Sequence, residues 1–286
     1  MGPLTGGMKF PPGFRLEKPI VQNTIEFGQS VASLIHFWIP GKLEAEAILV
    51  ANQRTKKLLP KHCKGSIHEG IIESGVDLKL WFPTQDKPRH NSNDSQVRFV
   101  YTGRLVKWKG VAYLIEAFKS ALNYVDAELL IVGSGNEREA LETQVSQLGI
   151  DDRVHFYGWL SHDEMRNCLA YSDVFVMPSL RESGGNSVLE AMAMGLPAIV
   201  TDWGGPGILV DETCGIKVKP NSPLEFTNGL SEAIVSLAQS EELRNRLGQN
   251  SLKRIKSNYF DWDSKIDYIL GVFESLTLKQ ESSTSS

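Results

Sequence analysis

The middle of the chain alternates short apolar runs with longer amphipathic segments. Each run is rich in β-branched and aromatic side chains and predicts a strand: Val97–Tyr101, Ala127–Val132, Val154–Tyr157, Val174–Met177 and Ala198–Thr201. The segments between them carry apolar residues at helical spacing and predict helices over 111–122, 137–148, 162–171 and 187–194. This alternation predicts an α/β fold with a parallel sheet built from right-handed βαβ units. Because the runs are almost entirely apolar, we expect helices on both faces of the sheet.

The N-terminal third follows a different pattern. Glu44–Leu59 predicts a helix, Gly65–Ile72 predicts a strand, and Val76–Phe82 predicts a strand or an extended edge. Asp86–Gln96 is polar, rich in Pro, Asn and Ser, and without periodicity, which is typical of a linker and predicts a domain boundary. The polar residues 280–286 predict a disordered tail.

Composition and charge narrow the function classes. Of the 286 residues, 41% are hydrophobic and 22% are charged, an ordinary globular composition with room for about two domains. The formal net charge of −4 argues against a nucleic-acid partner, which would call for a basic surface. The three cysteines have neither CxxC nor zinc-site spacing, which predicts reduced thiols, a cytoplasmic protein and no metal site.

Two features bear on membranes. The most apolar early run, Val31–Ile39, is far shorter than the ~20 residues that a membrane-crossing helix needs. The N-terminus lacks the charged and apolar regions of a signal peptide. A surface patch needs no long apolar run, so peripheral membrane association stays open.

The stretch RESGGNSVLEAMAMG, at 181–195, follows the fourth predicted strand. Ligands of parallel α/β sheets bind beyond the carboxyl ends of strands, so this is where a site is expected. Glu182 lies in the loop and Glu190 inside the helix, which argues against one tight acid–base pair of carboxylates. The helix start presents free backbone N–H groups that suit an anion, and its glycines permit close approach of a phosphate. These N–H groups belong to Gly184, Gly185, Asn186 and Ser187.

A basic loop follows the first predicted strand. Its sequence, TGRLVKWKG at 102–110, puts Arg104 and Lys109 at the same edge of the sheet. Two cations facing a helix N-terminus suit a diphosphate, because Arg binds phosphate oxygens bidentately and Lys acts as a mobile charge. A lone basic loop is more often solvated surface, and only the shared sheet edge favours a ligand site here.

Other motifs have ordinary structural interpretations. Gly133–Arg138 begins like a dinucleotide fingerprint but lacks its third glycine, so a strand-to-helix turn is favoured. The sequence DWD at 261–263 has the letters of a metal-binding motif but follows no apolar strand, so a helix N-cap is favoured. We expect His155 to be a buried core histidine and His162 to lie beside a helix cap, and neither spacing indicates a metal site. Trp203–Pro206 is either a tight turn or a border of the ligand pocket.

Four landmarks stand in order along the chain: YTGRL…KG at 101–110, LLIVGSG at 129–135, VHFYGW at 154–159 and PSLRESGGNSVLEAMAMGLP at 178–197. With these landmarks, residues from Phe99 to about Tyr268 resemble the nucleotide-sugar-binding domain of retaining GT-B glycosyltransferases of family 4, the glycosyl transferases group 1. The last landmark includes the E-x7-E signature of that family. It departs from the commoner E-x-F-G pattern, because Gly184-Gly185 replace an aromatic residue, and this leaves the donor sugar open.

The resemblance implies roles for the matching residues. Arg104 and Lys109 would neutralise the donor diphosphate, and Glu182 would contact the transferred sugar at the reacting centre. Glu190 would bind the ribose hydroxyls, and Trp159 would lie where the base sits. The residues expected to hold sugar and phosphate are Ser183, Gly184, Gly185, Asn186 and Ser187. The resemblance implies no metal and no cofactor beyond the nucleoside diphosphate sugar, which is the donor substrate.

The resemblance also implies three segments of unequal completeness. Residues 96–258 match a whole Rossmann-like donor-binding domain, whereas residues 1–95 match a partial N-terminal, acceptor-side domain and a linker. Residues 259–286 match the return helix and its disordered tail. Gly2–Gly7 resembles a loop deep inside the first domain of related enzymes, so we expect the opening strands, with their own glycine loop and acceptor-side His, to be missing. A truncated gene, a partial sequence or a split protein would each explain this.

Two main function hypotheses follow. The first is a glycosyltransferase of the EC 2.4 class that moves a sugar, with retention, to a saccharide, lipid or small-molecule acceptor in polysaccharide or glycolipid biosynthesis. The second is a truncated module that binds the nucleotide sugar without turnover. A phosphorylase or epimerase of the same fold is a weaker third, because no motif for a pyridoxal-phosphate lysine is seen.

Overall fold

The computed structural model describes residues 10–14, 41–83 and 96–284, with side chains as far as residue 278. Three segments with predictions lie outside the described residues: Gly2–Gly7, Val31–Ile39 and 86–95. The chain forms two compact units, which are described separately below. Unit 1 comprises 1–7, 15–75 and 262–286, and unit 2 comprises 8–14 and 76–261.

Unit 2 contains a six-stranded sheet in which every neighbouring pair is parallel. Its strands in chain order are β3 (Val97–Thr102), β4 (Ala127–Val132), β5 (Val154–Gly158), β6 (Val174–Met177), β7 (Ala198–Thr201) and β8 (Gly215–Val218). The five predicted strands and the predicted α/β parallel fold are confirmed, and β8 is an additional strand at the edge. Every residue of β6 and β7 is buried, as expected when helices cover both faces.

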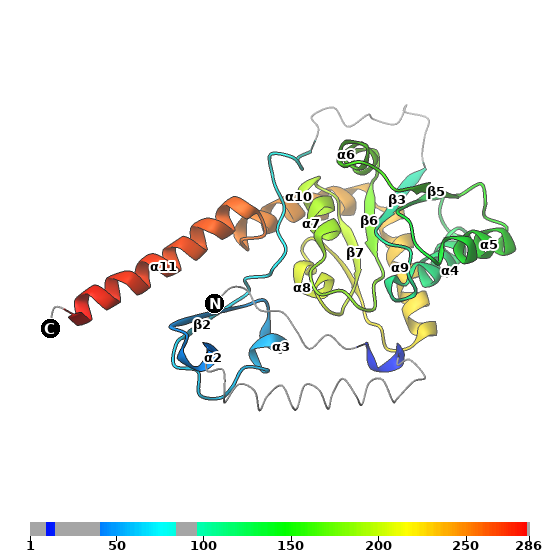
Figure 1. The fold of residues 1–286 in the computed structure, drawn as a ribbon. Helices are drawn as coiled ribbons and strands as arrows, with labels where there is room; N and C mark the ends of the chain where they lie inside the picture. The colour runs from blue at the N-terminus through cyan, green and yellow to red at the C-terminus, as the bar shows by residue number, and fades with distance from the viewer. Residues whose placement is uncertain (1–9, 15–40, 84–95, 285–286) are drawn as a thin grey trace. The chain divides into compact units, whose positions relative to one another are not determined.

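Helices lie on both sides of this sheet (Figure 1). They are α4 (Val111–Ala121), α5 (Arg138–Leu148), α6 (His162–Ala170), α7 (Asn186–Ala193), α8 (Pro206–Leu209), α9 (Pro223–Gln239) and α10 (Glu241–Ser257), with 3-10 turns η1 (Pro12–Phe14) and η2 (Lys107–Lys109). Helix α4 packs against α5 and α9, and α10 packs against α7. The four predicted helices are confirmed to within one or two residues at their ends.

The strand order of unit 2 determines where a ligand can lie. The order is β5-β4-β3-β6-β7-β8. Strands β4 and β5 therefore lie on one side of β3, and the chain then crosses to the other side of β3, where β6 lies. Strands β3 and β6 are therefore the neighbouring strands at which the strand order changes direction. Ligands of open α/β sheets bind at such a switch point. The loops that leave these two strands are those that carry Arg104, Lys109 and Glu182.

Unit 1 contains a small parallel pair, β1 (Ala47–Val50) with β2 (Ser66–Glu69), and the helices α2 (Gly41–Glu44), α3 (Gln53–Lys56) and α11 (Trp262–Thr284). The helix predicted over Glu44–Leu59 is wrong, because its apolar centre AILV forms β1 and only one turn after it is helical. A short apolar run buried all round has no periodicity that separates a strand from a helix. The side chain of Asn52 caps α3 by accepting from the Thr55 N–H at 2.9 Å, and this marks the true helix start.

Two other expectations need correction. Val76–Phe82 forms no strand: Val76 makes an isolated bridge with Asp261, and the residues after it form a turn in which the Trp81 N–H donates to the Asp77 carbonyl. Helix α11 continues to Thr284, into the tail predicted to be disordered. Extending an existing helix by one residue costs far less than nucleating a new one, so Gln280 and Glu281, both good helix formers, continue it.

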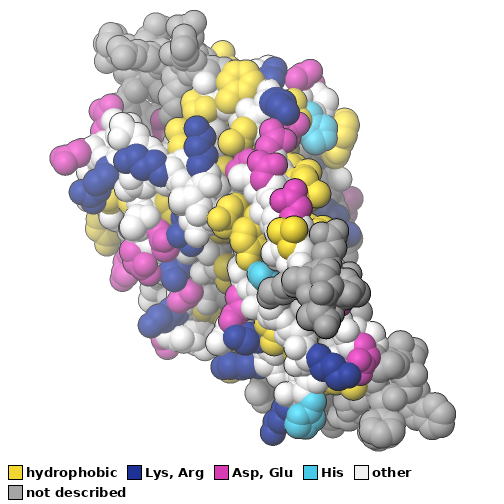
Figure 2. Space-filling view, turned by 90° about the vertical axis from the view of Figure 1, so that its left-hand side faces the viewer, with side chains coloured by type: hydrophobic (Ala, Val, Ile, Leu, Met, Phe, Trp, Pro, Cys, Tyr) yellow, Lys and Arg dark blue, Asp and Glu magenta, His cyan; other side chains and the backbone are white. Residues whose placement is uncertain are grey.

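The exposed surface of the described residues is mixed in charge. On the face in Figure 2, acidic and basic side chains are interspersed, in keeping with the net charge of −4. Among the described residues, no helix combines the length and the apolar character needed to cross a membrane.

Phe99→Ala tests the core of unit 2. The Phe99 side chain is fully buried, with its ring 6.3 Å from that of Phe118, so its removal should lower the free energy of unfolding by about 3–5 kcal/mol. Urea unfolding followed by circular dichroism measures the loss. Tyr124→Ala, at a residue 71% exposed, is the control and should change stability by less than about 0.5 kcal/mol. Equal losses in the two variants would contradict this description of the core.

Candidate functional site

Backbone contacts join the two loops at the switch point. The Leu180 N–H donates to the Trp108 carbonyl at 2.9 Å, and the Ser179 hydroxyl donates to the same oxygen at 3.4 Å. Gly110 has a φ of +72°, and a Cβ there would lie 2.2 Å from the Pro178 carbonyl oxygen. Only glycine fits this close approach, so the sequence KG after β3 is a packing requirement as well as a basic motif.

A salt bridge connects the side chains of the two loops. The Lys109 ammonium donates to the Glu182 carboxylate, and the two side chains are only 14% and 19% exposed. Sequence analysis placed Lys109 and Glu182 at one sheet edge, and the structure brings them into direct contact. The pair neutralises both charges where either alone would be poorly solvated.

The side chain of Tyr101 restrains the loop that carries Arg104. Sequence analysis did not single out this residue. It is a fully buried residue near the end of β3, and its hydroxyl donates to the Arg104 carbonyl at 3.0 Å. Burial raises the pKa of Tyr101 well above its usual range, and the nearby Glu182 charge raises it further. The phenol therefore stays neutral and keeps its proton for the Arg104 carbonyl. The Arg104 guanidinium itself is exposed and forms no ion pair within the described part of the chain.

Helix α7 begins at the candidate anion site. Its N-cap is Gly185, with a φ of +111°, and no side chain of this residue accepts hydrogen bonds from the N–H groups of the first turn. Asn186 is exposed and Ser187 is half-buried at this helix start. Backbone N–H groups and the helix dipole both favour an anion at such an end.

Gly205, which lies beyond β7, holds the loop before α7 in place. Its N–H donates to the Glu182 carbonyl at 2.8 Å, and a Cβ on it would lie 2.1 Å from the Gly184 carbonyl oxygen. Ser183 between them is exposed. The turn at 203–206 thus supports the loop, which favours the tight-turn interpretation of that sequence.

Glu190 lies in the second turn of α7, on a different element from Glu182. Its side chain is half-buried, and burial raises the pKa of its carboxyl, while the His162 charge opposes the rise. Within the described chain, its carboxylate has no hydrogen-bond or ion-pair partner. A half-buried carboxylate without a protein partner has capacity to accept hydrogen bonds from ligand hydroxyls.

Trp159 lies at the far side of the sheet from these groups. It follows β5, and its side chain is 76% exposed. Strands β4 and β3 lie between β5 and β6, so about 14 Å separates Trp159's strand from the one leading to Glu182. The structure therefore brings Arg104, Lys109, Glu182 and the α7 start together, and leaves Trp159 at one end of the same edge.

Two weaker motifs, at Gly133 and His162, have ordinary structural roles. A Cβ on Gly133 would lie 1.9 Å from the Gly103 carbonyl oxygen, so this glycine permits close packing of two loops. His162 begins α6 next to the capping box formed by Ser161 and Glu164, as expected.

The expectation of a core histidine at His155 is wrong: its side chain is 39% exposed, with Nε2 3.5 Å from a carboxylate oxygen of Glu128. An alternating edge strand such as β5 exposes one face to solvent. No cluster of three metal-ligating side chains occurs in the part of the chain that the structure describes.

Comparisons with known proteins identify relatives of this architecture. A family model described as glycosyl transferases group 1 matches residues 83–254, more than half of the chain. The uncharacterized glycosyltransferase MJ1607 of Methanocaldococcus jannaschii is 33% identical over a region covering 73% of this chain and 53% of the relative. The chain spans about half the length of the curated relatives that it matches.

Solved structures share the fold. Sucrose-phosphate synthase from Thermosynechococcus elongatus has a TM-score of 0.68 at 26% identity, covering 83% of this chain and 60% of that one. Alr3699/HepE from Anabaena, solved in complex with UDP and glucose, has a TM-score of 0.65 at 20% identity, covering 82% and 64%. The second likeness shows the fold alone. Together they confirm the predicted GT-B type of α/β fold.

Gly110→Ala tests the contact between the two loops. Both the left-handed backbone and the clash with Pro178 oppose a Cβ, so we expect a loss of about 2–4 kcal/mol in the free energy of unfolding. Gly149→Ala is the matched control, because Gly149 has a φ of +64° but no atom within 4 Å of the place that a Cβ would occupy; it should lose only about 1 kcal/mol. Urea unfolding of both variants gives the comparison. If the two losses are equal, the loops are not in contact at Gly110.

Proposed function

Because this chain belongs to the glycosyl transferases group 1 family, we propose that it moves a sugar from a nucleoside diphosphate sugar to a hydroxyl acceptor with retention of configuration. One observation carries the proposal: the switch point unites the Lys109–Glu182 pair with the uncapped start of α7. A diphosphate needs positive charge and N–H donors, and a sugar needs hydrogen-bonding carboxylates close by. The site offers both at one edge of the sheet.

The proposed roles divide along the nucleotide sugar. Arg104, Lys109 and the α7 start stabilise the diphosphate, whose charge grows as it leaves, so this electrostatic stabilisation is the main catalytic effect. Glu182 binds the transferred sugar. Glu190 accepts hydrogen bonds from the ribose, and the exposed Trp159 offers a surface for the base. The loop residues Ser183, Gly184, Gly185, Asn186 and Ser187 surround the phosphates and the sugar.

The reaction needs no separate base in this scheme. The bond between the anomeric carbon and the diphosphate oxygen breaks, and a bond from that carbon to the acceptor oxygen forms. The acceptor proton passes to an oxygen of the leaving phosphate. The acceptor in this reaction is a hydroxyl group of a saccharide, a lipid or a small molecule.

The segments of the chain have proposed roles in this reaction. Residues 96–258 are the donor-binding domain, 1–95 contribute part of the acceptor side, and 259–286 form the return helix. Since the chain spans about half the length of its curated relatives, donor binding without turnover is the second candidate function. Peripheral contact with a membrane remains compatible with either function.

Titration with UDP-glucose, UDP-N-acetylglucosamine and GDP-mannose tests the proposal. Calorimetry measures binding, and a coupled assay of nucleotide release measures donor hydrolysis and transfer to added acceptors. Binding with turnover supports the enzyme, and binding without turnover supports the module. Failure of all three nucleotide sugars and of UDP to bind would overturn both.

Substitution of the two glutamates tests the division of roles. Glu190→Ala should weaken UDP binding by about tenfold, because two hydrogen bonds to the ribose are lost. Glu182→Ala should keep or raise the UDP affinity, because it removes the carboxylate that pairs with Lys109, and it should weaken the additional affinity that the sugar provides. Calorimetric titration of each variant with UDP and with the donor separates these effects. Equal loss of UDP affinity in both variants would contradict the assignment.

The affinity for UDP should also depend on pH through Glu190. Only the ionised carboxylate accepts two ribose hydrogen bonds, and burial raises its pKa above the ordinary value of 4.5. Affinity should therefore be full above this raised pKa and fall as the pH drops through it. UDP titrations from pH 8 to pH 4 on the native protein and on Glu190→Gln measure the difference, since phosphate titration is common to both. Identical pH profiles would show that Glu190 does not bind the ribose.

A further inference from the structure

Residues 10–14 form a short strap on unit 2, although more than eighty residues separate them from its sheet. The ring of Phe14 packs edge-on against Tyr113 at 5.3 Å and Phe226 at 5.7 Å, and those two rings lie 6.0 Å apart. Pro11 is buried as well. This three-ring cluster attaches the strap to the first turns of α4 and α9, four residues along the chain from Phe10.

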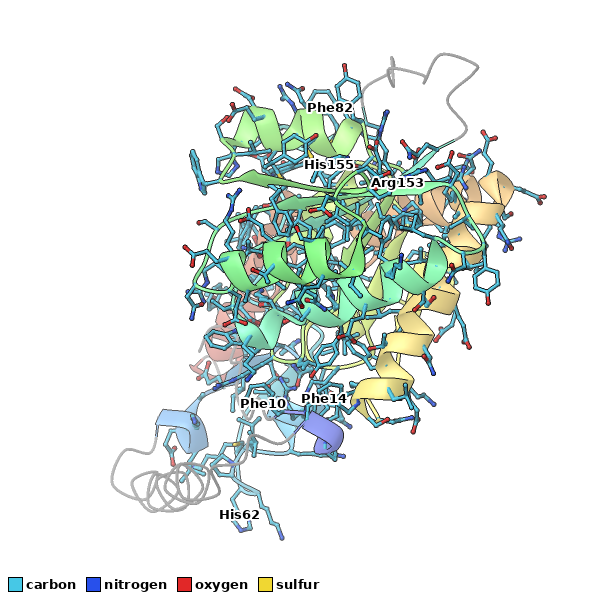
Figure 3. The ribbon with its side chains drawn as sticks, turned by 90° about the vertical axis from the view of Figure 1, so that its right-hand side faces the viewer. Phe10, Phe14, His62, Phe82, Arg153 and His155 are labelled. Atoms are coloured by element: carbon cyan, nitrogen blue, oxygen red, sulfur yellow. The ribbon has the colours of Figure 1, made fainter. Side chains whose placement is uncertain are left out.

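Phe10 touches the loop of the candidate site. The guanidinium carbon of Arg181 lies over the Phe10 ring, 5.7 Å from its centre, and Arg181 directly precedes Glu182. Figure 3 shows Phe10 and Phe14 together at one end of the unit, away from Arg153 and His155 at its other end. An aromatic ring under a guanidinium restricts its motion and leaves its N–H edge free for hydrogen bonds.

Arg181 differs from the other arginines that the structure places over aromatic rings. Arg138, Arg166 and Arg254 each stack on a phenylalanine, and each also forms a salt bridge, with Glu142, Asp163 and Asp211 respectively. Arg181 is exposed and has no ion pair among the described residues. The Phe10 ring lies against this charge next to the site, and no acidic side chain of the described residues pairs with it.

We propose that Arg181 is a specificity-determining residue that binds an anionic group, a phosphate or a carboxylate, on the acceptor, and that Phe10 is its positioning residue. The inference rests on the proposed function. In that function the donor diphosphate is already matched by Arg104, Lys109 and the α7 start. A further fixed cation beside the sugar-binding Glu182 therefore suits a negative charge that the donor does not carry. The planar guanidinium can bind either anion bidentately.

Acceptors that differ by one anionic group provide the test. The pairs are glucose with glucose 6-phosphate, glycerol with glycerol 3-phosphate, and glycerol with glycerate. Transfer is measured by product formation from the donor that the titration selects, and binding to the UDP-saturated protein is measured by calorimetry. The native protein should prefer the anionic member of at least one pair by about tenfold or more, in kcat/KM or in affinity.

Arg181→Gln should remove most of that preference, and the UDP affinity should stay within about twofold. Arg166→Gln is the matched control: it removes another stacked arginine, one whose charge Asp163 already balances, and should keep the preference. Phe10→Leu should reduce the preference and Phe10→Trp should restore it, which a merely structural role would not do.

Two results would overturn the inference: no anionic member is preferred in any pair, or Arg181→Gln keeps the full preference. Both differ from failure of the proposed function, in which the native protein does not bind UDP at all.

Discussion

The salt bridge between Lys109 and Glu182 joins the loops that leave β3 and β6. Both side chains are largely shielded from solvent, so their attraction is screened less than that of an open surface pair, and either charge alone would be costly. The contact exists because β6 lies beside β3, on the side opposite to β4 and β5. The same strand order places the start of α7 at this edge, since α7 follows the Glu182 loop directly.

This salt bridge gives the proposed reaction a physical coupling between sugar and phosphate. A bound diphosphate would compete with Glu182 for the Lys109 ammonium. In this proposal Lys109 would turn to the phosphate, and the Glu182 carboxylate would become available to sugar hydroxyls. The hydroxyl of neutral Tyr101 donates to the Arg104 carbonyl and so restrains the backbone that carries the second proposed cation.

The sequence predicted the elements around the site well, because five of the six strands of unit 2 are apolar runs bounded by glycine or proline. It also placed Arg104, Lys109 and Glu182 at one edge, since parallel strands end on the same side. It failed where local pattern is ambiguous. The run AILV in the N-terminal part is buried on every side, so its residues fit a strand or a buried helix equally well. Only its pairing with Ser66–Glu69 makes it a strand.

Other features of the site depend on contacts that no local pattern contains. The N–H of Gly205 donates to the Glu182 carbonyl. The ring of Phe10, about 170 positions earlier in the sequence, packs against the Arg181 guanidinium. Both contacts act on the same short loop, one through its carbonyl and one through its side chain. The loop before α7 is therefore restrained from two sides, which limits the motion of its backbone at Glu182 and of the Arg181 side chain. A site that acts by electrostatics benefits most from this restraint, because fixed charges and dipoles stabilise a transition state without the cost of reorienting.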